Sequence, residues 1–219
     1  MLGQVRSQVT RKRAGMIAAL TMAATIAAGT VAATPALADD PVEFPVSFAV
    51  AGSSVVKKTN STINLGPGQL TGAIVVNGDD VGIRGNLTLP PATANISLAS
   101  GIFRIRATVK VTPVAPVTGV LKDGDLLTHA QVNMEINNIV VGLIVPIIPL
   151  PTVPSSCKTV SPIDMNLITK DVDLFAPTIT QTGTYTIPAF KNCLIADLAL
   201  GSLVSGPDNT ISLTLTSNS

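Results

Sequence analysis

Hydrophobic and polar residues alternate one by one along several short stretches of the chain. In the clearest stretch, the apolar positions on one face are Phe103, Ile105, Ala107, Val109 and Val111. A period of two residues is that of a β-strand with one face in the core and one in solvent. The same alternation runs through residues 83–89, 131–136 and 211–216. The pattern predicts half-buried antiparallel strands.

Turn-forming residues separate these stretches. They are Gly66-Pro67-Gly68, Asn77-Gly78-Asp79, Pro90-Pro91, Asp123-Gly124-Asp125 and Ser205-Gly206-Pro207-Asp208-Asn209. Val, Ile and Thr make up about a third of residues 39–219, and such β-branched residues favour strands. The expected fold is all-β, an antiparallel β-sandwich or partly open barrel in one domain. Only residues 192–203 suggest a helix, because Leu194 and Leu198 have helical spacing and Ser-Gly-Pro follows; strand and loop is the alternative.

The first 38 residues have the pattern of a signal peptide. Four basic residues precede an apolar run from Met16 to Ala33, and Ala36-Leu37-Ala38 is a typical cleavage site. We expect cleavage after Ala38, which leaves a secreted domain of residues 39–219 with no transmembrane anchor; the alternative is an uncleaved anchor. Cleavage removes four basic residues and no acidic one, so the mature domain has 10 basic and 13 acidic residues and a net charge near −3.

Both cysteines of the chain, Cys157 and Cys193, lie in the mature domain. Export places them in an oxidising compartment, where a disulfide persists. The bridge spans 36 positions, and the chain-entropy model assigns such a loop about 4 kcal/mol of stability. A catalytic thiol would instead need an unpaired cysteine beside His129, the only histidine, so we favour the disulfide.

Residues 139–151 contain no polar side chain. One interpretation is a strand buried on both faces, Ile139 to Val145, that continues into a proline-rich connection over a sheet edge. The other is an exposed segment that forms a partner surface, a lipid-contacting tip or the lid of an apolar cavity. The candidate interaction or lid residues are Ile139, Val141, Leu143, Ile144, Val145, Ile147, Ile148 and Leu150.

Few residues in the chain are suited to catalysis or metal binding. Charged residues are only 12% of the sequence, which disfavours nucleic acid as a partner. We expect His129 at the surface rather than as a base, since no Gly-x-Ser-x-Gly motif supplies a nucleophile. Asp123 and Asp125 could bind calcium, but Asp-Gly-Asp is first of all a hairpin turn, and no acidic cluster has EF-hand spacing. We therefore expect no enzyme activity, no cofactor and no metal.

Several segments together resemble a group of exported, β-rich actinobacterial proteins with one cysteine pair and no known activity. The segments that carry the resemblance are Gly85-Asn-Leu-Thr-Leu-Pro-Pro91, Thr112-Pro-Val-Ala-Pro-Val-Thr-Gly119, the two cysteines with Gly183–Cys193, and Ser205–Thr216. The resemblance implies a secreted β-rich bacterial protein with paired cysteines, and it implies no catalytic residues.

These observations favour a non-catalytic binding or interaction module of the bacterial cell envelope or exterior. The alternative is a carrier of an apolar, lipid-like ligand in a cavity of the sheet, because the low aromatic content suits acyl chains better than sugars. A hydrolase would need two facing carboxylates and is the least favoured class.

Overall fold

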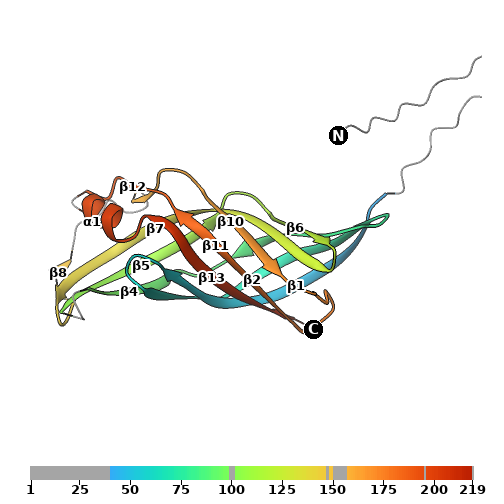
Figure 1. Cartoon of the computed structure of the whole chain (residues 1–219), viewed down its shortest axis with the longest axis horizontal. Coiled ribbons are helices and arrows are strands. Elements are labelled where there is room, and N and C mark those ends of the chain that lie inside the picture. Colours follow the sequence, from blue (N-terminus) through green and yellow to red (C-terminus); the bar gives the residue numbers. More distant parts are fainter. Residues whose placement is uncertain (1–39, 99–101, 147, 150–156, 195, 219) are drawn as a thin grey trace, which may run out of the picture. The chain divides into compact units, whose positions relative to one another are not determined.

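The computed structural model describes residues 40–98, 102–146, 148–149, 157–194 and 196–218. The predicted all-β class is confirmed, because the described residues form thirteen antiparallel strands and one short helix (Figure 1). The strands are β1 (Val42–Val56), β2 (Ser61–Asn77), β3 (Asp80–Thr88), β4 (Ala92–Leu98), β5 (Phe103–Pro113), β6 (Val117–Lys122), β7 (Asp125–Leu143), β8 (Ile148–Pro149), β9 (Lys158–Thr159), β10 (Ile163–Thr169), β11 (Thr178–Ile187), β12 (Phe190–Lys191) and β13 (Gly206–Ser217). The helix is α1 (Ala196–Leu203).

The sheet closes on itself. Strands β3 and β4 together pair with β2, and β5 and β6 together pair with β7, so each pair acts as one long strand with a break. Every long strand then pairs with the next one along the chain, and β1 pairs with both β2 and β13. Of the two predicted architectures, the observed one is therefore the barrel. Within this closed sheet, β2 and β4 share a single residue pair, Ile63 with Ala94.

The inward positions of the strands form a single apolar core. In β5 the alternation places Ala107, Val109 and Val111 inside, as the sequence predicts, and Met134 and Ile136 of β7 are buried with them. With eight long strands, a closed sheet is just wide enough for side chains to fill its interior.

Two predicted turns are confirmed and three are corrected. Residues 77–79 and 123–125 connect hairpins, but Gly66-Pro67-Gly68 lies inside β2, where the register with β1 shifts between Val50 and Gly52. Pro90-Pro91 interrupts a long strand without reversing it, since proline cannot donate a ladder hydrogen bond. Residues 206–209 begin β13, where the buried Asn209 amide donates to the carbonyl oxygens of Tyr185 and Gly206. In these three places, residues typical of turns cause a local irregularity in a strand and do not reverse the chain.

The helix predicted for residues 192–203 is confirmed for its last eight residues, Ala196–Leu203. Leu200 of α1 and Val204 after it are buried, and both contact the core at one end of the barrel, which we call the helix end (Figure 1). The hairpin turns at residues 77–80 and 122–125 and the loop at 170–177 lie at the opposite end. No helix in the described ranges is long and apolar enough to cross a membrane.

Candidate functional site: an exposed apolar tip

Six large apolar side chains are exposed together at the helix end of the barrel. They lie at or next to the start of β5, the end of β7 and the start of β8, and we call them the apolar tip: Ile102, Phe103, Leu143, Ile144, Val145 and Ile148. Phe103 pairs with Leu143 across the two strands, and Ile148 pairs with Val141. The backbone N–H of Ile144 donates to the carbonyl oxygen of Ile102 at 2.7 Å. The tip is therefore a hydrogen-bonded extension of the sheet.

A β-bulge in β7 decides which residues of the apolar segment face inward. Before it, even-numbered residues such as Met134 and Ile136 are buried; after it, Ile139 is buried at 3% exposure. The register with β5 shifts between Arg106 and Thr108, and Asn138 has a left-handed backbone with φ 51°. Asparagine tolerates that conformation better than most residues. The extra residue moves the inward face from even to odd positions.

The prediction of a strand buried on both faces is wrong for most of residues 139–145. Among its described members only Ile139 is fully buried, Val141 is half-buried, and Leu143 and Ile144 are 61% and 70% exposed. Val145 and Ile148 are also exposed, so the alternative of an exposed segment fits the structure. Ile147 and Leu150 lie outside the described residues. An exposed apolar group of this size is typical of an interaction site.

Two tip residues were not among the sequence candidates. Ile102 and Phe103 are 54% and 53% exposed, although Phe103 had been assigned to the core face of its strand. It does occupy the inward side, but it lies at the strand end, beyond the filled part of the barrel. The signal that could have identified them is the adjacent pair of large apolar residues directly after the Ser100-Gly101 turn signal.

Basic side chains flank the tip, and acidic ones gather at the other end of the barrel. Arg104 and Arg106 are exposed on the outer face of β5, next to Phe103. β4, β5 and β8 carry no acidic residue. The turns and loop at the opposite end carry two lysines, Lys122 and Lys170, and six aspartates: Asp79, Asp80, Asp123, Asp125, Asp171 and Asp173. At the helix end, α1 carries one aspartate, Asp197. The strands next to the tip and the turns at the opposite end therefore differ in the sign of their charge.

The barrel interior leaves two apolar cavities of about 50 Å³ each. The helix-end cavity is lined in part by Leu200, Leu203 and Val204, whereas no described residue of α1 lines the inner cavity. Both cavities are lined by Ile63, Val109 and Met134, so these three side chains lie between them.

Two polar pairs line the inner cavity. The Ser54 and Tyr185 hydroxyls are 2.6 Å apart, and the Gln181 amide donates to the Thr128 hydroxyl at 2.6 Å. Burial raises the pKa of Tyr185, and the hydrogen bond to Ser54 opposes that shift in part. Because these polar groups bond to one another, they are satisfied within the wall of the barrel.

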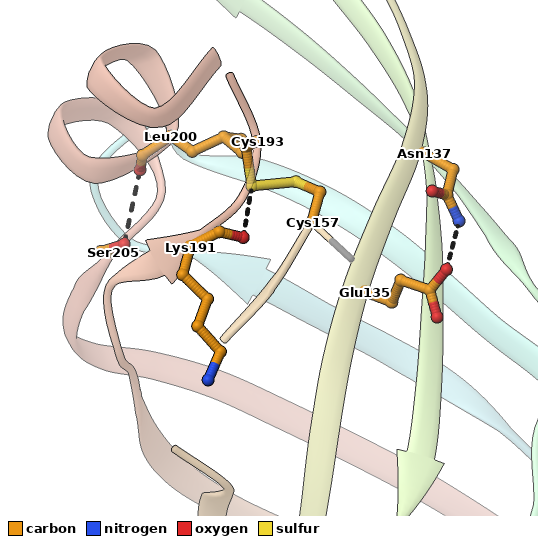
Figure 2. The surroundings of a disulfide bond; sticks show 7 residues. All are labelled: Glu135, Asn137, Cys157, Lys191, Cys193, Leu200 and Ser205. Carbon is orange, nitrogen blue, oxygen red and sulfur yellow. Dashed lines mark hydrogen bonds between the residues drawn. A yellow bond between two sulfur atoms is a disulfide. The ribbon is translucent and has the colours of Figure 1, made fainter. Parts of the chain in front are cut away.

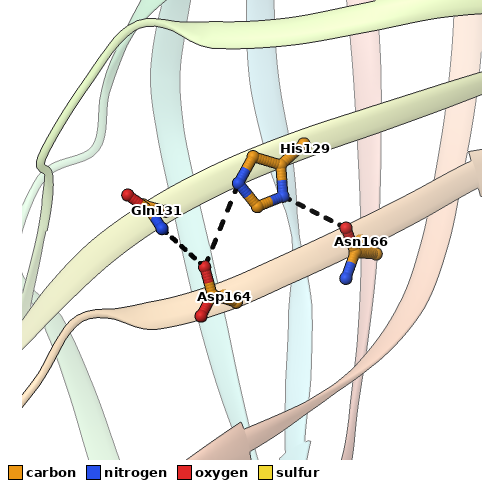
Figure 3. Close-up of polar contacts among 4 residues, drawn as sticks. All are labelled: His129, Gln131, Asp164 and Asn166. Atoms are coloured by element: carbon orange, nitrogen blue, oxygen red, sulfur yellow. Dashed lines mark hydrogen bonds and ion pairs between the residues drawn. The ribbon is translucent and has the colours of Figure 1, made fainter.

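His129 lies on the outer face of β7, as expected (Figure 3). Its Nδ1 is 3.1 Å from Asn166 Oδ1, and its Nε2 is 3.9 Å from a carboxylate oxygen of Asp164. The Gln131 amide donates to the same Asp164 oxygen at 2.7 Å. The side chain of His129 is 48% exposed, so this polar ladder between β7 and β10 is open to solvent.

The Asp-Gly-Asp turn forms an ion pair within the protein. Asp125 accepts hydrogen bonds from the Lys170 ammonium and from the backbone N–H of Asp171. The hydrogen bond from Lys170 lowers the pKa of Asp125, and the same bond raises the pKa of Lys170. Asp123 has φ 53°, which fits a hairpin turn. Within the described part of the chain, no three His, Cys, Asp or Glu residues are grouped so that they could hold a metal ion.

The predicted disulfide between Cys157 and Cys193 is confirmed, and both residues are fully buried (Figure 2). The carbonyl oxygen of Cys157 accepts from the Ile136 N–H of β7 at 2.9 Å, and Cys193 precedes α1. Next to the bridge, β9 pairs with β12. The disulfide thus connects the barrel wall to the segment that leads into the closing helix.

No protein-family model, curated protein or solved structure matches this chain. The candidate site therefore rests on the geometry of the apolar tip, its flanking arginines and the filled interior.

Proposed function

We propose that the protein is an exported, non-catalytic binding module of the bacterial cell envelope or exterior, and that the apolar tip is its contact surface. The observation that carries this proposal is the shared exposure of six large apolar side chains at one end of a barrel whose interior is filled. Exposing such a group to water is unfavourable unless a partner covers it.

Export belongs to the same proposal. A buried disulfide persists in an oxidising compartment, which supports export. The resemblance to exported actinobacterial proteins points to a bacterial cell envelope as the setting. N-terminal sequencing of the protein from culture medium tests this part, and a first residue other than Asp39 contradicts the proposed cleavage.

The size of the cavities favours a binding module over a carrier. An apolar cavity of about 150 Å³ takes up a molecule as small as benzene. Each cavity here is about a third of that volume, and Ile63, Val109 and Met134 separate the two. An acyl chain would need the interior to reorganise, whereas the tip can make contact without any change in the core.

The test is co-sedimentation of the mature protein with isolated envelopes of the producing bacterium. The tip variant Leu143→Ser should lose most of its binding, because Leu143 is central to the tip and paired with Phe103. Phe175→Ser is the matched control, since Phe175 is 82% exposed in the loop at the opposite end. Equal sedimentation of both variants and the wild type would contradict the proposal.

A further inference from the structure

The partner of the apolar tip can be specified further from the charges and backbone bonds around it. We propose that the tip docks onto an anionic lipid surface, with its apolar side chains among the acyl chains and Arg104 and Arg106 at the level of the lipid phosphates. This inference rests on the proposed function and names the partner of the same site.

The backbone of the tip is suited to an apolar environment. A buried backbone N–H needs a hydrogen-bond partner when water is removed. At the tip, the Ile144 N–H donates to Ile102 and the Val145 N–H donates to Leu143. The pairing of β8 with β7 occupies further backbone groups. These backbone donors therefore stay hydrogen-bonded when the tip is inserted. A protein partner that extended the sheet with a strand of its own would instead need unbonded backbone groups at the tip.

The spacing of residues along β5 matches the structure of a lipid surface. A strand rises about 3.3 Å per residue, so Arg104 and Arg106 lie roughly 3 to 10 Å behind Phe103 along the strand. Apolar groups at a membrane interface enter to a depth of about 5–10 Å. When the tip is inserted to that depth, the two arginines reach the phosphates, which guanidinium groups bind well.

The charge distribution supports an anionic partner and an end-on orientation. The strands that carry the tip present Arg104 and Arg106 on β5, and the nearest acidic residue on β7 is Glu135, which lies farther from the tip, opposite Lys110. The aspartates at the opposite end are repelled by an anionic surface. A second copy of the chain docked tip to tip would instead bring the arginines of both copies close together, which is unfavourable.

The chain contains no tryptophan, so a single introduced tryptophan reports its own surroundings without background. Val145→Trp places the probe in the tip, and Phe175→Trp places it at the opposite end. Both are added to vesicles of phosphatidylcholine with about 30% phosphatidylglycerol. We expect a blue-shifted emission and quenching by brominated lipids for Val145→Trp and neither effect for Phe175→Trp.

Binding affinities then test the two kinds of side chain separately. The double variant Arg104→Gln/Arg106→Gln should bind the anionic vesicles about 25-fold more weakly, at about fivefold for each arginine. Lys122→Gln, in the opposite turn, is the matched control and should bind like the wild type. Leu143→Ser should bind roughly tenfold more weakly, because it removes one exposed apolar side chain from the inserted group. Circular dichroism of each variant checks that the fold is retained.

Several results would overturn the lipid proposal. They are equal emission shifts of both tryptophan probes, equal binding to neutral and anionic vesicles, or a dimer in solution that Leu143→Ser abolishes while vesicles remain unbound. Envelope binding that depends on Leu143 without any vesicle binding overturns the lipid partner and leaves the binding module standing. A Leu143→Ser protein that binds envelopes and vesicles like the wild type overturns both proposals.

Discussion

Met134 is the side chain whose removal best tests whether the barrel interior is filled and rigid. It is 5% exposed in β7 and lies between the inner cavity and the helix-end cavity. The substitution Met134→Ala removes three heavy atoms from this partition and joins the two cavities. Because the strands are hydrogen-bonded all round the barrel, the walls cannot close in without breaking ladder bonds.

The expected cost has two parts. Loss of most of a buried methionine side chain forfeits about 2 kcal/mol of transfer free energy. The wild type already contains both cavities, so only the volume left by the three lost heavy atoms counts, roughly 60 Å³, and at about 24 cal/mol per Å³ this adds roughly 1.5 kcal/mol. The free energy of unfolding should therefore fall by roughly 3.5 kcal/mol, within the range typical of buried Met→Ala substitutions.

The matched control is Met165→Ala. Met165 is 7% exposed and lines the inner cavity only, so its removal enlarges one cavity and joins none. Its cost should be similar, because the same three heavy atoms are lost, and the two variants differ in whether the cavities are joined. Urea unfolding followed by far-ultraviolet circular dichroism, with the disulfide intact, measures both values.

Ligand rescue tests the joined cavity directly. A dry apolar cavity of about 150 Å³ takes up benzene, so benzene should raise the Tm of Met134→Ala more than that of Met165→Ala or the wild type. Equal shifts of Tm by benzene for Met134→Ala and Met165→Ala would refute the account of a rigid, divided interior.

Three further predictions concern the disulfide, the only tyrosine and two glycines. Replacing Cys157 and Cys193 together by alanine should lower the free energy of unfolding by about 4 kcal/mol in urea titrations, because the bridge closes a loop of 36 positions; a loss under about 1 kcal/mol contradicts this. Burial raises the pKa of Tyr185 above 10.0, its ordinary value. The buried, neutral tyrosine therefore contributes to the free energy of unfolding below pH 10.0, and this contribution is lost as the pH rises through the pKa of the folded state. Tyrosinate absorbance reports this residue alone, and a native midpoint at or below that of the unfolded chain contradicts the shift. Gly72→Ala should lower Tm strongly, because the added Cβ would lie 1.9 Å from a backbone oxygen of the paired strand. Gly201→Ala in α1 should instead raise stability by roughly 0.5–1 kcal/mol, because the added Cβ meets nothing within 4 Å. Equal effects of the two substitutions in thermal unfolding would contradict the steric argument.

The strands could be predicted from the sequence because each needs only its own alternation. In β5 every second residue from Ile105 to Val111 is apolar, and the core face follows directly. The closure of the sheet could not be predicted in this way, because the pairing of β1 with β13 joins residues more than 150 positions apart and leaves no local pattern. The prolines at 90 and 91 also misled the prediction, since a break in a long strand and a turn use the same residue types.

The apolar segment shows why the candidate site could be found only in part. Its lack of polar residues indicated something unusual, but composition alone does not distinguish a buried strand from an exposed one. The bulge at Asn138 decides the matter, because it turns Ile139 and Val141 inward at the point where the barrel interior ends. The residues that follow keep the same apolar character but have no core left to enter.

The length of β7 relative to the filled interior therefore accounts for the tip. The buried residues of β7 lie between Leu126 and Ile139. The strand then continues to Leu143, which pairs with Phe103 at the start of β5. Polar residues at positions 143–145 would satisfy the same backbone pairing and avoid the cost of apolar exposure. Folding thus gives no reason for leucine, isoleucine and valine at these positions. Contact with an apolar partner does give one, and Arg104 and Arg106 beside them fit a partner with negative charge at its surface.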